Sequence, residues 1–187
     1  MTILNQAAAQ QFDYRWYPCH RINKQTVPSK LWPWLTTADS LTAKLQSIGH
    51  LTVKVLEDDW GTATPRERKR LKLRPRDATR IRTVVLYCDG TAVILARSVV
   101  PASALKGRWR QVKHLKTKPL GGYLFQHRAL KRSPIEVAKL PKNLFPNQNK
   151  ALWARRSVFL QYGQGILVNE VFFDTITHLA QPFKTYE

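Results

Sequence analysis

The chain has 187 residues, of which 43% are hydrophobic and 10% aromatic, which is enough to pack one core and too many for a disordered chain. Lys and Arg outnumber Asp and Glu by 31 to 12, and the net charge of +19 predicts an anionic partner: nucleic acid, an anionic membrane surface or a carboxylate-bearing metabolite. No apolar run approaches the roughly 18 residues of a membrane span, and no secretion signal is evident. We therefore expect a cytoplasmic protein whose two cysteines, Cys19 and Cys88, are free thiols.

The N-terminal third contains signals for two helices and one strand. Leu41, Leu45 and Ile48 fall on one face of a predicted helix that Gly49 would end. Apolar and polar side chains alternate after His50, as in a strand. The elements expected here are an irregular arm over 1–27, a short helix over 31–35, a helix over 39–48 and a strand over 50–58.

The middle of the chain contains a helix start and a hairpin turn. Thr64-Pro-Arg-Glu67 fits a capping box with Pro at the first helical position. Asp89-Gly90 is the preferred two-residue turn of a β-hairpin. The elements expected here are a basic helix over 65–73, strands over 79–88 and 91–100, and a helix over 102–115.

The C-terminal third opens with a glycine loop, Lys118-Pro-Leu-Gly-Gly-Tyr-Leu-Phe125. Its bare backbone allows close approach of an anion to main-chain N–H groups, especially if a helix starts at Tyr123. The elements expected after it are a strand over 128–140 interrupted near Pro134, a loop over 141–150, a hairpin of 152–161 and 166–173 about a turn at 162–165, and an unassigned tail over 174–187. Long hairpin strands with clustered helices predict one α+β domain over 1–187, built on an antiparallel sheet.

Two charged residues share strand faces with apolar ones. Alternation places Glu170 beside Val168 and Phe172, and Arg82 beside Val84. If these faces are the core, Glu170 needs a partner and Arg82 becomes a two-pronged donor for a carboxylate. The alternatives are a solvated Glu170 and an Arg82 that reaches back to water from its strand end.

The remaining arginines are ambiguous. Arg97 lies inside an apolar strand, and Arg80 is expected to be exposed. Arg155 and Arg156 point to opposite faces, so one is expected in solvent while the other could line a pocket. The basic segment over 66–82 is either a solvated face or a surface for nucleic acid or anionic lipid. No metal-ligand spacing, nucleotide-binding loop or nucleophile motif is found, so an enzyme of this sequence would work without metal, nucleotide or covalent intermediate.

In several segments the chain resembles the chorismate pyruvate-lyase family. The matches occur in family order and cover most of the chain from 31 to 173. They are Asp39-Ser-Leu-Thr42, Cys88-Asp-Gly90, Arg97-Ser-Val-Val-Pro101, Pro119-Leu-Gly121, Tyr123-Leu-Phe125, Leu152-Trp-Ala-Arg-Arg-Ser157 and Asn169-Glu-Val-Phe172. Together and in this order, the segments are specific for the family that the chain resembles.

The resemblance implies an enzyme that converts chorismate to 4-hydroxybenzoate and pyruvate, the first committed step of ubiquinone synthesis, without a cofactor. It also implies a single domain that encloses an internal ligand pocket. In that pocket Arg82 and Glu170 would contact the ligand and act as the catalytic pair. The backbone N–H groups of Leu120 and Gly121 would meet the ligand, and Leu41 would form part of the wall.

The chain departs from the family in its basic segment over 66–82, in Gly122 where Arg is common, and in the loop over 141–150. Leu41 stands where relatives often carry Met, a swap that keeps apolar character and volume. Two interpretations of another class stay open: a non-catalytic module that senses a small metabolite, as in some bacterial transcription regulators, and a basic nucleic-acid-binding protein. The charge also allows peripheral contact with an anionic membrane; we expect a monomer that binds no specific nucleic acid.

Overall fold

A computed structural model of the chain describes residues 12–107, 109–125, 129–142, 144–145 and 150–183. These residues form an α+β domain on one eight-stranded sheet whose paired strands are all antiparallel, which confirms the predicted fold class. The strands are β1 (Tyr17–Pro18), β2 (Leu51–Gly61), β3 (Thr79–Cys88), β4 (Thr91–Pro101), β5 (Lys131–Arg132), β6 (Glu136–Lys139), β7 (Trp153–Gln161) and β8 (Gln164–Phe172).

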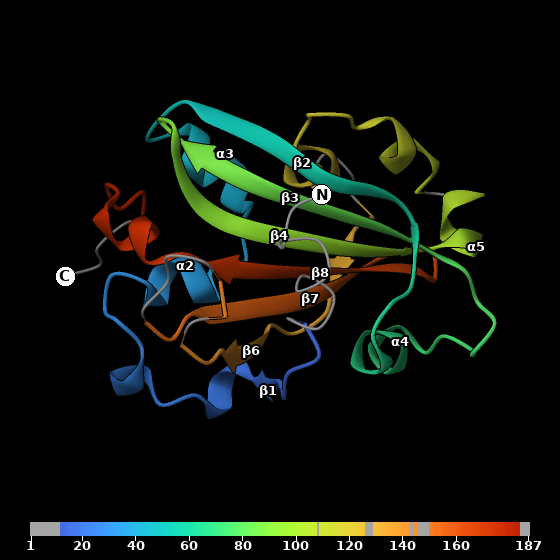
Figure 1. The fold of residues 1–187 in the computed structure, drawn as a ribbon, viewed down its shortest axis with the longest axis horizontal. Helices are drawn as coiled ribbons and strands as arrows, with labels where there is room; N and C mark the ends of the chain where they lie inside the picture. The colour runs from blue at the N-terminus through green and yellow to red at the C-terminus, as the bar shows by residue number, and fades with distance from the viewer. Residues whose placement is uncertain (1–11, 108, 126–128, 143, 146–149, 184–187) are drawn as a thin grey trace.

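The helices are short and lie against the two faces of this sheet. The sheet order is β1-β6-β7-β8-β4-β3-β2, and β5 also pairs with β7 (Figure 1). The α-helices are α2 (Trp32–Thr36), α3 (Leu41–Gln46), α4 (Pro65–Leu71), α5 (Ala102–Leu105) and α6 (Leu120–Leu124). The 3₁₀ turns are η1 (Cys19–Arg21), η2 (Lys24–Thr26), η3 (Arg110–His114) and η4 (Asp174–His178).

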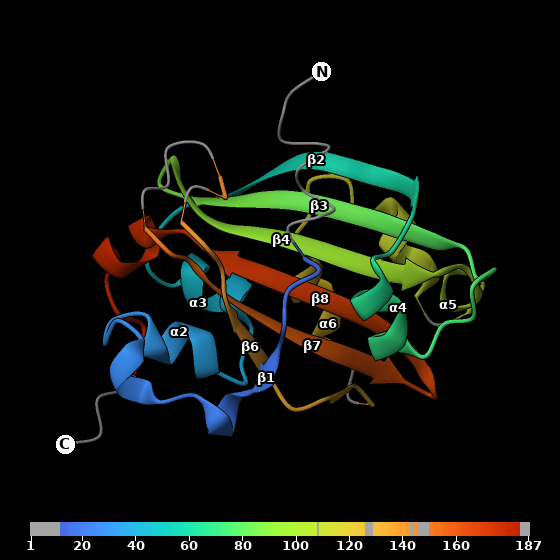
Figure 2. The same cartoon turned by 60° about the horizontal axis from the view of Figure 1, so that its bottom comes forward.

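The two sheet faces have different covers, because strand side chains alternate between them. One face packs against α2 and α3 at one end and against α5, η3 and α6 at the other. The opposite face carries α4 and the segment around Phe12 (Figure 2). The first face is the one that holds a cavity.

Two local predictions are confirmed in backbone detail. Asp89 and Gly90, between β3 and β4, have φ values of 48° and 76°, the left-handed pair that a tight hairpin turn requires. At the start of α4, the Thr64 hydroxyl accepts the Glu67 N–H at 3.3 Å, and Glu67 Oε2 accepts the Thr64 N–H at 2.9 Å. The predicted capping box is therefore present.

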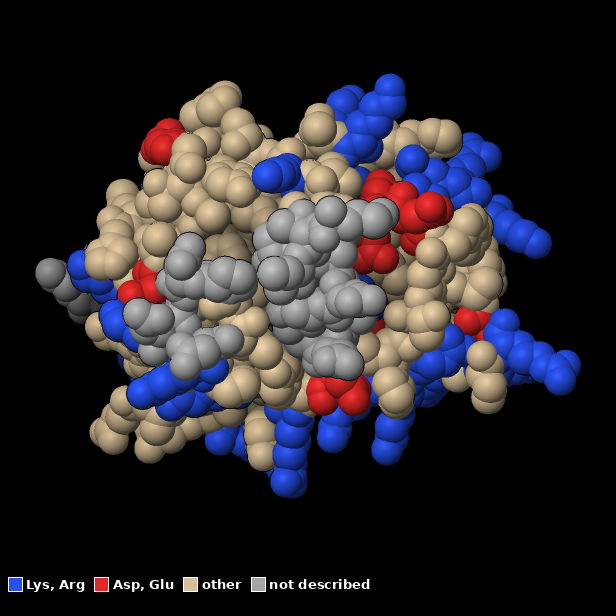
Figure 3. Space-filling view, viewed as in Figure 1, with Lys and Arg blue, Asp and Glu red and all other residues tan. Residues whose placement is uncertain are grey.

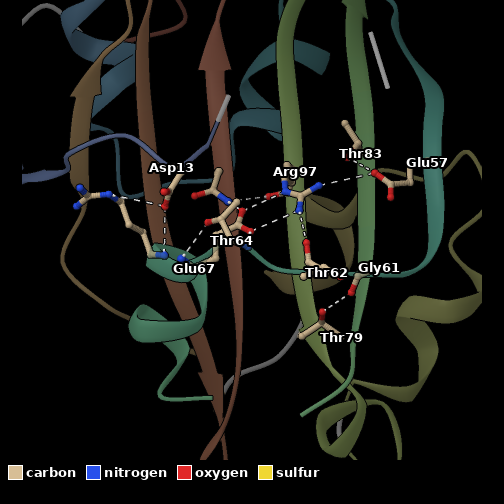
Figure 4. A network of polar contacts seen from close by, with 11 residues as sticks. Asp13, Glu57, Gly61, Thr62, Thr64, Glu67, Thr79, Thr83 and Arg97 are labelled. Carbon is tan, nitrogen blue, oxygen red and sulfur yellow. Dashed lines mark hydrogen bonds and ion pairs between the residues drawn. The ribbon is translucent and has the colours of Figure 1, made fainter. Parts of the chain in front are cut away.

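A buried charge pair ties α4 to the face opposite the cavity. Glu67 is completely buried, and its Oε1 lies 3.1 Å from Nε of Arg97, whose side chain is 2% exposed. Asn169 donates to the same Oε1 at 2.9 Å, and the Thr62 carbonyl accepts from Arg97 at 3.3 Å (Figure 4). Arg97, ambiguous from sequence, thus points away from the cavity and helps to hold α4 on the sheet.

The helix predicted over 102–115 is wrong in part, because the chain forms α5 and η3 as separate pieces. Gly107 lies between them, and glycine has low helix propensity. A Cβ at this position would collide with the side chain of Gln164. Trp109 is fully buried, and its indole Nε1 donates to the Gln164 carbonyl at 2.9 Å. These contacts with Gln164, at the start of β8, outweigh continuation of the helix.

Two other boundaries differ from the prediction. Helix α6 begins at Leu120, with Pro119 as its N-cap residue, rather than at Tyr123. The turn between β7 and β8 consists of two residues, Tyr162 and Gly163, instead of four. Both have positive φ values, 48° and 80°, so this hairpin uses the same tight turn as Asp89-Gly90 although its first residue is an aromatic one.

The segments expected to be irregular are partly ordered. In the arm, β1 pairs with β6, and Phe12 is fully buried on the face that carries α4. The strand predicted over 128–140 consists of β5 and β6 on either side of Pro134. The loop over 141–150 contributes the buried Phe145, and the tail contains η4. Parts of these segments (1–11, 128, 143, 146–149 and 184–187) lie outside the described residues.

Cys19 and Cys88 are free thiols, as expected. None of the helices in the described ranges has both the length and the apolar character needed to cross a membrane.

Candidate functional site

An internal cavity lies between the sheet and helices α3 and α6. Apolar side chains of the strands, among them Val84, Leu86 and Val168, form much of its wall. The residues singled out in the sequence all line it: Leu41, Arg82, Leu120, Gly121 and Glu170. The structure thus brings the five together, while their roles toward a ligand stay a prediction.

Strand pairing places Arg82 and Glu170 on one surface of the sheet. Arg82 on β3 is opposite Ser98 on β4, and Ala96 on β4 is opposite Glu170 on β8. Neighbouring strands are about 4.8 Å apart, so β3 and β8 are separated by about 10 Å across the sheet. The side chain of Arg82 is 2% exposed and that of Glu170 is 16% exposed. The alternatives that placed these side chains in bulk solvent are therefore wrong.

Arg82 is held by a carboxylate on β2 and by backbone carbonyls of the loop that leads into α6. Its Nη1 lies 2.6 Å from Oδ2 of Asp58, and its Nη2 donates to the carbonyls of Lys116 at 2.6 Å and Lys118 at 3.2 Å. Asp58 also accepts Nε of Arg80 at 2.8 Å, so Arg80 is half-buried and paired, not exposed as predicted. One carboxylate shared by two guanidinium groups leaves an excess positive charge beside the loop that leads into α6.

The partner that a buried Glu170 requires is Arg155. Nε of Arg155 lies 2.7 Å from Oε2 of Glu170, and β7 pairs with β8 so that these two residues are directly opposite. Nη1 of Arg155 donates to the carbonyls of Trp34 at 3.1 Å and Thr37 at 2.8 Å. The Glu170 carboxyl group is thus a fixed hydrogen-bond acceptor whose orientation is set from the sheet.

Arg132 on β5 is the third arginine of the cavity wall. Its Nε donates to the Ser157 hydroxyl at 3.0 Å, and its guanidinium carbon lies 5.1 Å from the centre of the Phe159 ring. Its Nη1 donates to the carbonyls of Thr37 at 3.3 Å and Ala38 at 3.0 Å. These contacts fix the plane of the group against the cavity wall.

No Asp or Glu among the described residues forms an ion pair with Arg132. Burial, followed by the nearby charge of Arg155, lowers the pKa of Arg132 to about 10, while Glu170 and Asp39 act in the opposite direction. The group stays cationic at neutral pH, but its charge is poorly compensated. An anion in the cavity would compensate it.

Helix α6 approaches α3 so closely that only glycine fits at one position. A Cβ on Gly121 would collide with Oγ1 of Thr42 and would lie 3.1 Å from its Cβ and 3.2 Å from Oγ of Ser40. At Gly122 nothing lies within 4 Å of the same atom. The N–H groups of Leu120 and Gly121, in the first turn of α6, have no acceptor within the helix. Gly121 therefore serves packing as well as backbone access.

The cavity is narrow. Its volume is about 50 Å³, well below the roughly 300–1,000 Å³ of typical ligand pockets, so a ring-sized ligand requires the cavity walls to move apart. Two larger surface grooves, of about 580 Å³ and 420 Å³, lie over η3 and Tyr123, but neither contains any of the five predicted residues. Across the described parts of the chain, no group of three His, Cys, Asp or Glu is arranged to hold a metal ion.

Arg156 is not part of the cavity, and the expectation that one of Arg155 and Arg156 points to solvent is wrong. Arg156 is 7% exposed on the opposite sheet face, with Nε 3.1 Å from Oε2 of Glu136. Arg70 on α4 lies 2.6 Å from the same oxygen. Burial by itself would raise the pKa of Glu136, but the hydrogen bonds from Arg70 and Arg156 lower it below its usual value. Both sheet faces therefore bury arginine.

Sequence reasoning missed Asp58, Arg132 and the identity of the partner of Glu170. Asp58 is the second of three adjacent acidic positions on β2, and nothing local distinguishes it from its neighbours. Arg132 lies in a segment with no strong period. Alternation allowed either Arg155 or Arg156 to line a pocket, and the pairing of Arg155 with Glu170 depends on the β7–β8 register. Shortening the turn to Tyr162-Gly163 in the prediction would have placed the two opposite each other.

The sequence matches the family described as chorismate lyase over residues 13–181. Two relatives are each described as a probable chorismate pyruvate-lyase. The relative from Aromatoleum aromaticum is 37% identical over 165 residues, which cover 82% of this chain and 89% of that protein. The relative from Nitrosospira multiformis is 36% identical over 188 residues, which cover 92% and 99%.

Among solved structures, the chain is similar to the C-terminal domain of the histidine utilization repressor from Pseudomonas syringae pv. tomato. The TM-score is 0.52 at 15% identity, and the match covers 73% of this chain and 100% of that one. At this level of identity the likeness shows a shared fold and nothing about activity.

Proposed function

Because the chain belongs to the chorismate lyase family, we propose that it converts chorismate to 4-hydroxybenzoate and pyruvate. The observation that best supports this proposal is the placement of Arg82 and Glu170 on opposite sides of one internal cavity. Chorismate is a dianion that carries a ring carboxylate, a ring hydroxyl at the far end of the ring, and an enolpyruvyl ether beside that hydroxyl. A cation at one end and an acceptor at the other suit this layout.

In the proposed binding mode, the ring carboxylate pairs with Arg82 and receives the N–H groups of Leu120 and Gly121. Glu170 accepts the hydrogen bond of the ring hydroxyl. Leu41 and the apolar strand side chains pack against the ring. This arrangement uses two charged hydrogen bonds to fix the ring and leaves the apolar wall to exclude water.

The reaction needs positioning more than strong chemical groups. The ether bond between the ring and the enolpyruvyl oxygen breaks, the adjoining carbon that bears the hydroxyl loses its hydrogen, and the ring becomes aromatic. The released enolpyruvate gains a proton and becomes pyruvate. Because aromatisation drives the reaction, holding the reactive conformer and stabilising the leaving enolate with fixed cations accounts for the catalysis without a cofactor. Glu170, already an acceptor for Arg155, orients the substrate.

The proposal extends to the setting of the enzyme. The product would enter ubiquinone synthesis, and the protein would act as a monomer. On the face shown in Figure 3, Lys and Arg side chains are spread around the rim instead of forming one track. The net charge of +19 attracts anionic substrates over long distances and suits loose contact with an anionic membrane.

Incubating the purified protein with chorismate tests the proposal. The expected result is 4-hydroxybenzoate, followed by its absorbance, together with an equal amount of pyruvate. Binding of chorismate without turnover would identify a metabolite-sensing module instead. If the protein neither binds nor converts chorismate, both interpretations are wrong.

A further inference from the structure

The cavity contains one cationic group that the proposed binding mode does not use. Arg155 already serves Glu170 at 2.7 Å, and Arg82 shares Asp58 with Arg80. Arg132 donates to one hydroxyl and two backbone carbonyls, and none of the described residues accepts a hydrogen bond from its Nη2. A guanidinium group has five donors and matches a carboxylate in two-pronged geometry.

The order of the strands places Arg132 at the end of the cavity away from Arg82. From β3, which carries Arg82, the sheet runs through β4 and β8 to β7, and β5 with Arg132 pairs with the far edge of β7. Arg132 is therefore on the same side as Arg155 and Glu170. Its contact with Ser157, two residues from Arg155 on β7, agrees with this placement.

The shape of chorismate brings its second carboxylate to the same end. If Arg82 holds the ring carboxylate, the ring hydroxyl lies at the far end near Glu170. The enolpyruvyl group is attached to the carbon next to the one bearing that hydroxyl, so its carboxylate lies within reach of the β7–β5 side. The two under-compensated cations, Arg82 and Arg132, then match the two negative charges of the substrate.

We infer that Arg132 binds the enolpyruvyl carboxylate of chorismate and thereby distinguishes the dianionic substrate from the monoanionic aromatic product. This inference rests on the proposed function. Arg132 holds the part of the substrate that leaves as pyruvate, whereas Arg82 and Glu170 hold the part that stays as 4-hydroxybenzoate. When the ether bond breaks, the charge that develops on the enolpyruvate fragment lies beside a fixed cation.

The test compares substrate and product in Arg132→Met and Arg132→Lys variants. For Arg132→Met we expect kcat/KM for chorismate to fall about 10–100-fold, the effect of losing a charged hydrogen-bonded contact. The inhibition constant of 4-hydroxybenzoate should change less than about threefold. Arg132→Lys keeps the charge and should lose less activity than the Met variant, again with product binding unchanged. Arg82→Met, by contrast, should weaken substrate and product alike.

The structural alternative is that Arg132 only anchors the segment at Thr37 and Ala38. In that case kcat/KM for chorismate and the affinity for 4-hydroxybenzoate would fall together, and the inference would be wrong. Unchanged kcat/KM in both variants would also overturn it. If circular dichroism shows that Arg132→Met does not fold, the comparison of kcat/KM for chorismate with the affinity for 4-hydroxybenzoate is made on Arg132→Lys instead. Absence of turnover in the unmodified protein would instead count against the proposed function itself.

Discussion

Replacing Arg82 by Met removes the cation at one end of the cavity and provides the sharpest test of the catalytic pair. The side chain is 2% exposed, so its hydrogen bonds act where water screens little. Loss of one such preorganised donor costs about 10²–10³ in rate, or about 2.7–4 kcal/mol of transition-state stabilisation. We expect kcat/KM for chorismate to fall by that factor, measured as the initial rate of 4-hydroxybenzoate formation.

The matched control is Arg80→Met on the same strand. Both arginines bind Asp58, Arg80 at 2.8 Å and Arg82 at 2.6 Å, but only Arg82 lines the cavity. In either variant Asp58 keeps one guanidinium partner, so no buried carboxylate is left alone. We expect near-normal kcat/KM for Arg80→Met. Equal losses in the two variants, or an Arg82→Met enzyme within about threefold of the unmodified rate, would refute the assigned role.

Three further predictions concern stability and packing. Gly121→Ala should lower the melting temperature and activity, because its Cβ would collide with Thr42, whereas Gly122→Ala, in open space, should be nearly neutral; loss in both would contradict the packing argument. Glu67→Gln removes the fully buried carboxylate of Arg97 and should cost about 3–5 kcal/mol in urea unfolding. Glu57→Gln removes only the half-exposed partner of Arg97, 3.7 Å away, and should cost less than about 1 kcal/mol. The pKa of Glu136 is lower in the folded than in the unfolded protein. Its ionised carboxylate therefore stabilises the fold above the unfolded-state pKa of about 4.3, and this stabilisation is lost as the pH falls through the folded-state pKa. The stability difference between unmodified protein and Glu136→Gln, from urea unfolding at pH 7 and pH 3.5, should shrink at the lower pH; a constant difference would exclude this linkage.

The candidate site shows where sequence reasoning succeeds and where it stops. Alternation along β3 and β8 assigned Arg82 and Glu170 to the apolar sheet face, and burial confirms that assignment. The same reasoning sent one of Arg155 and Arg156 to solvent, although both are buried, Arg156 on the opposite face beside Glu136. Period-two alternation states which face a side chain takes. It contains no information on what covers that face, which here depends on α4 and on segments far away in sequence.

What the sequence by itself determined is local: the Asp89-Gly90 turn, the capping box of α4 and the strand faces follow from residue type over a few positions. Only the tertiary structure decided that Arg155 meets Glu170, that Asp58 bridges two arginines, and that the helix over 102–115 gives way to the contact of Trp109 with the start of β8. The physical reason is that backbone preferences act between neighbours and amount to a fraction of a kcal/mol per residue. Ion pairing and burial, worth several times more, act between groups that only strand register and helix packing bring together.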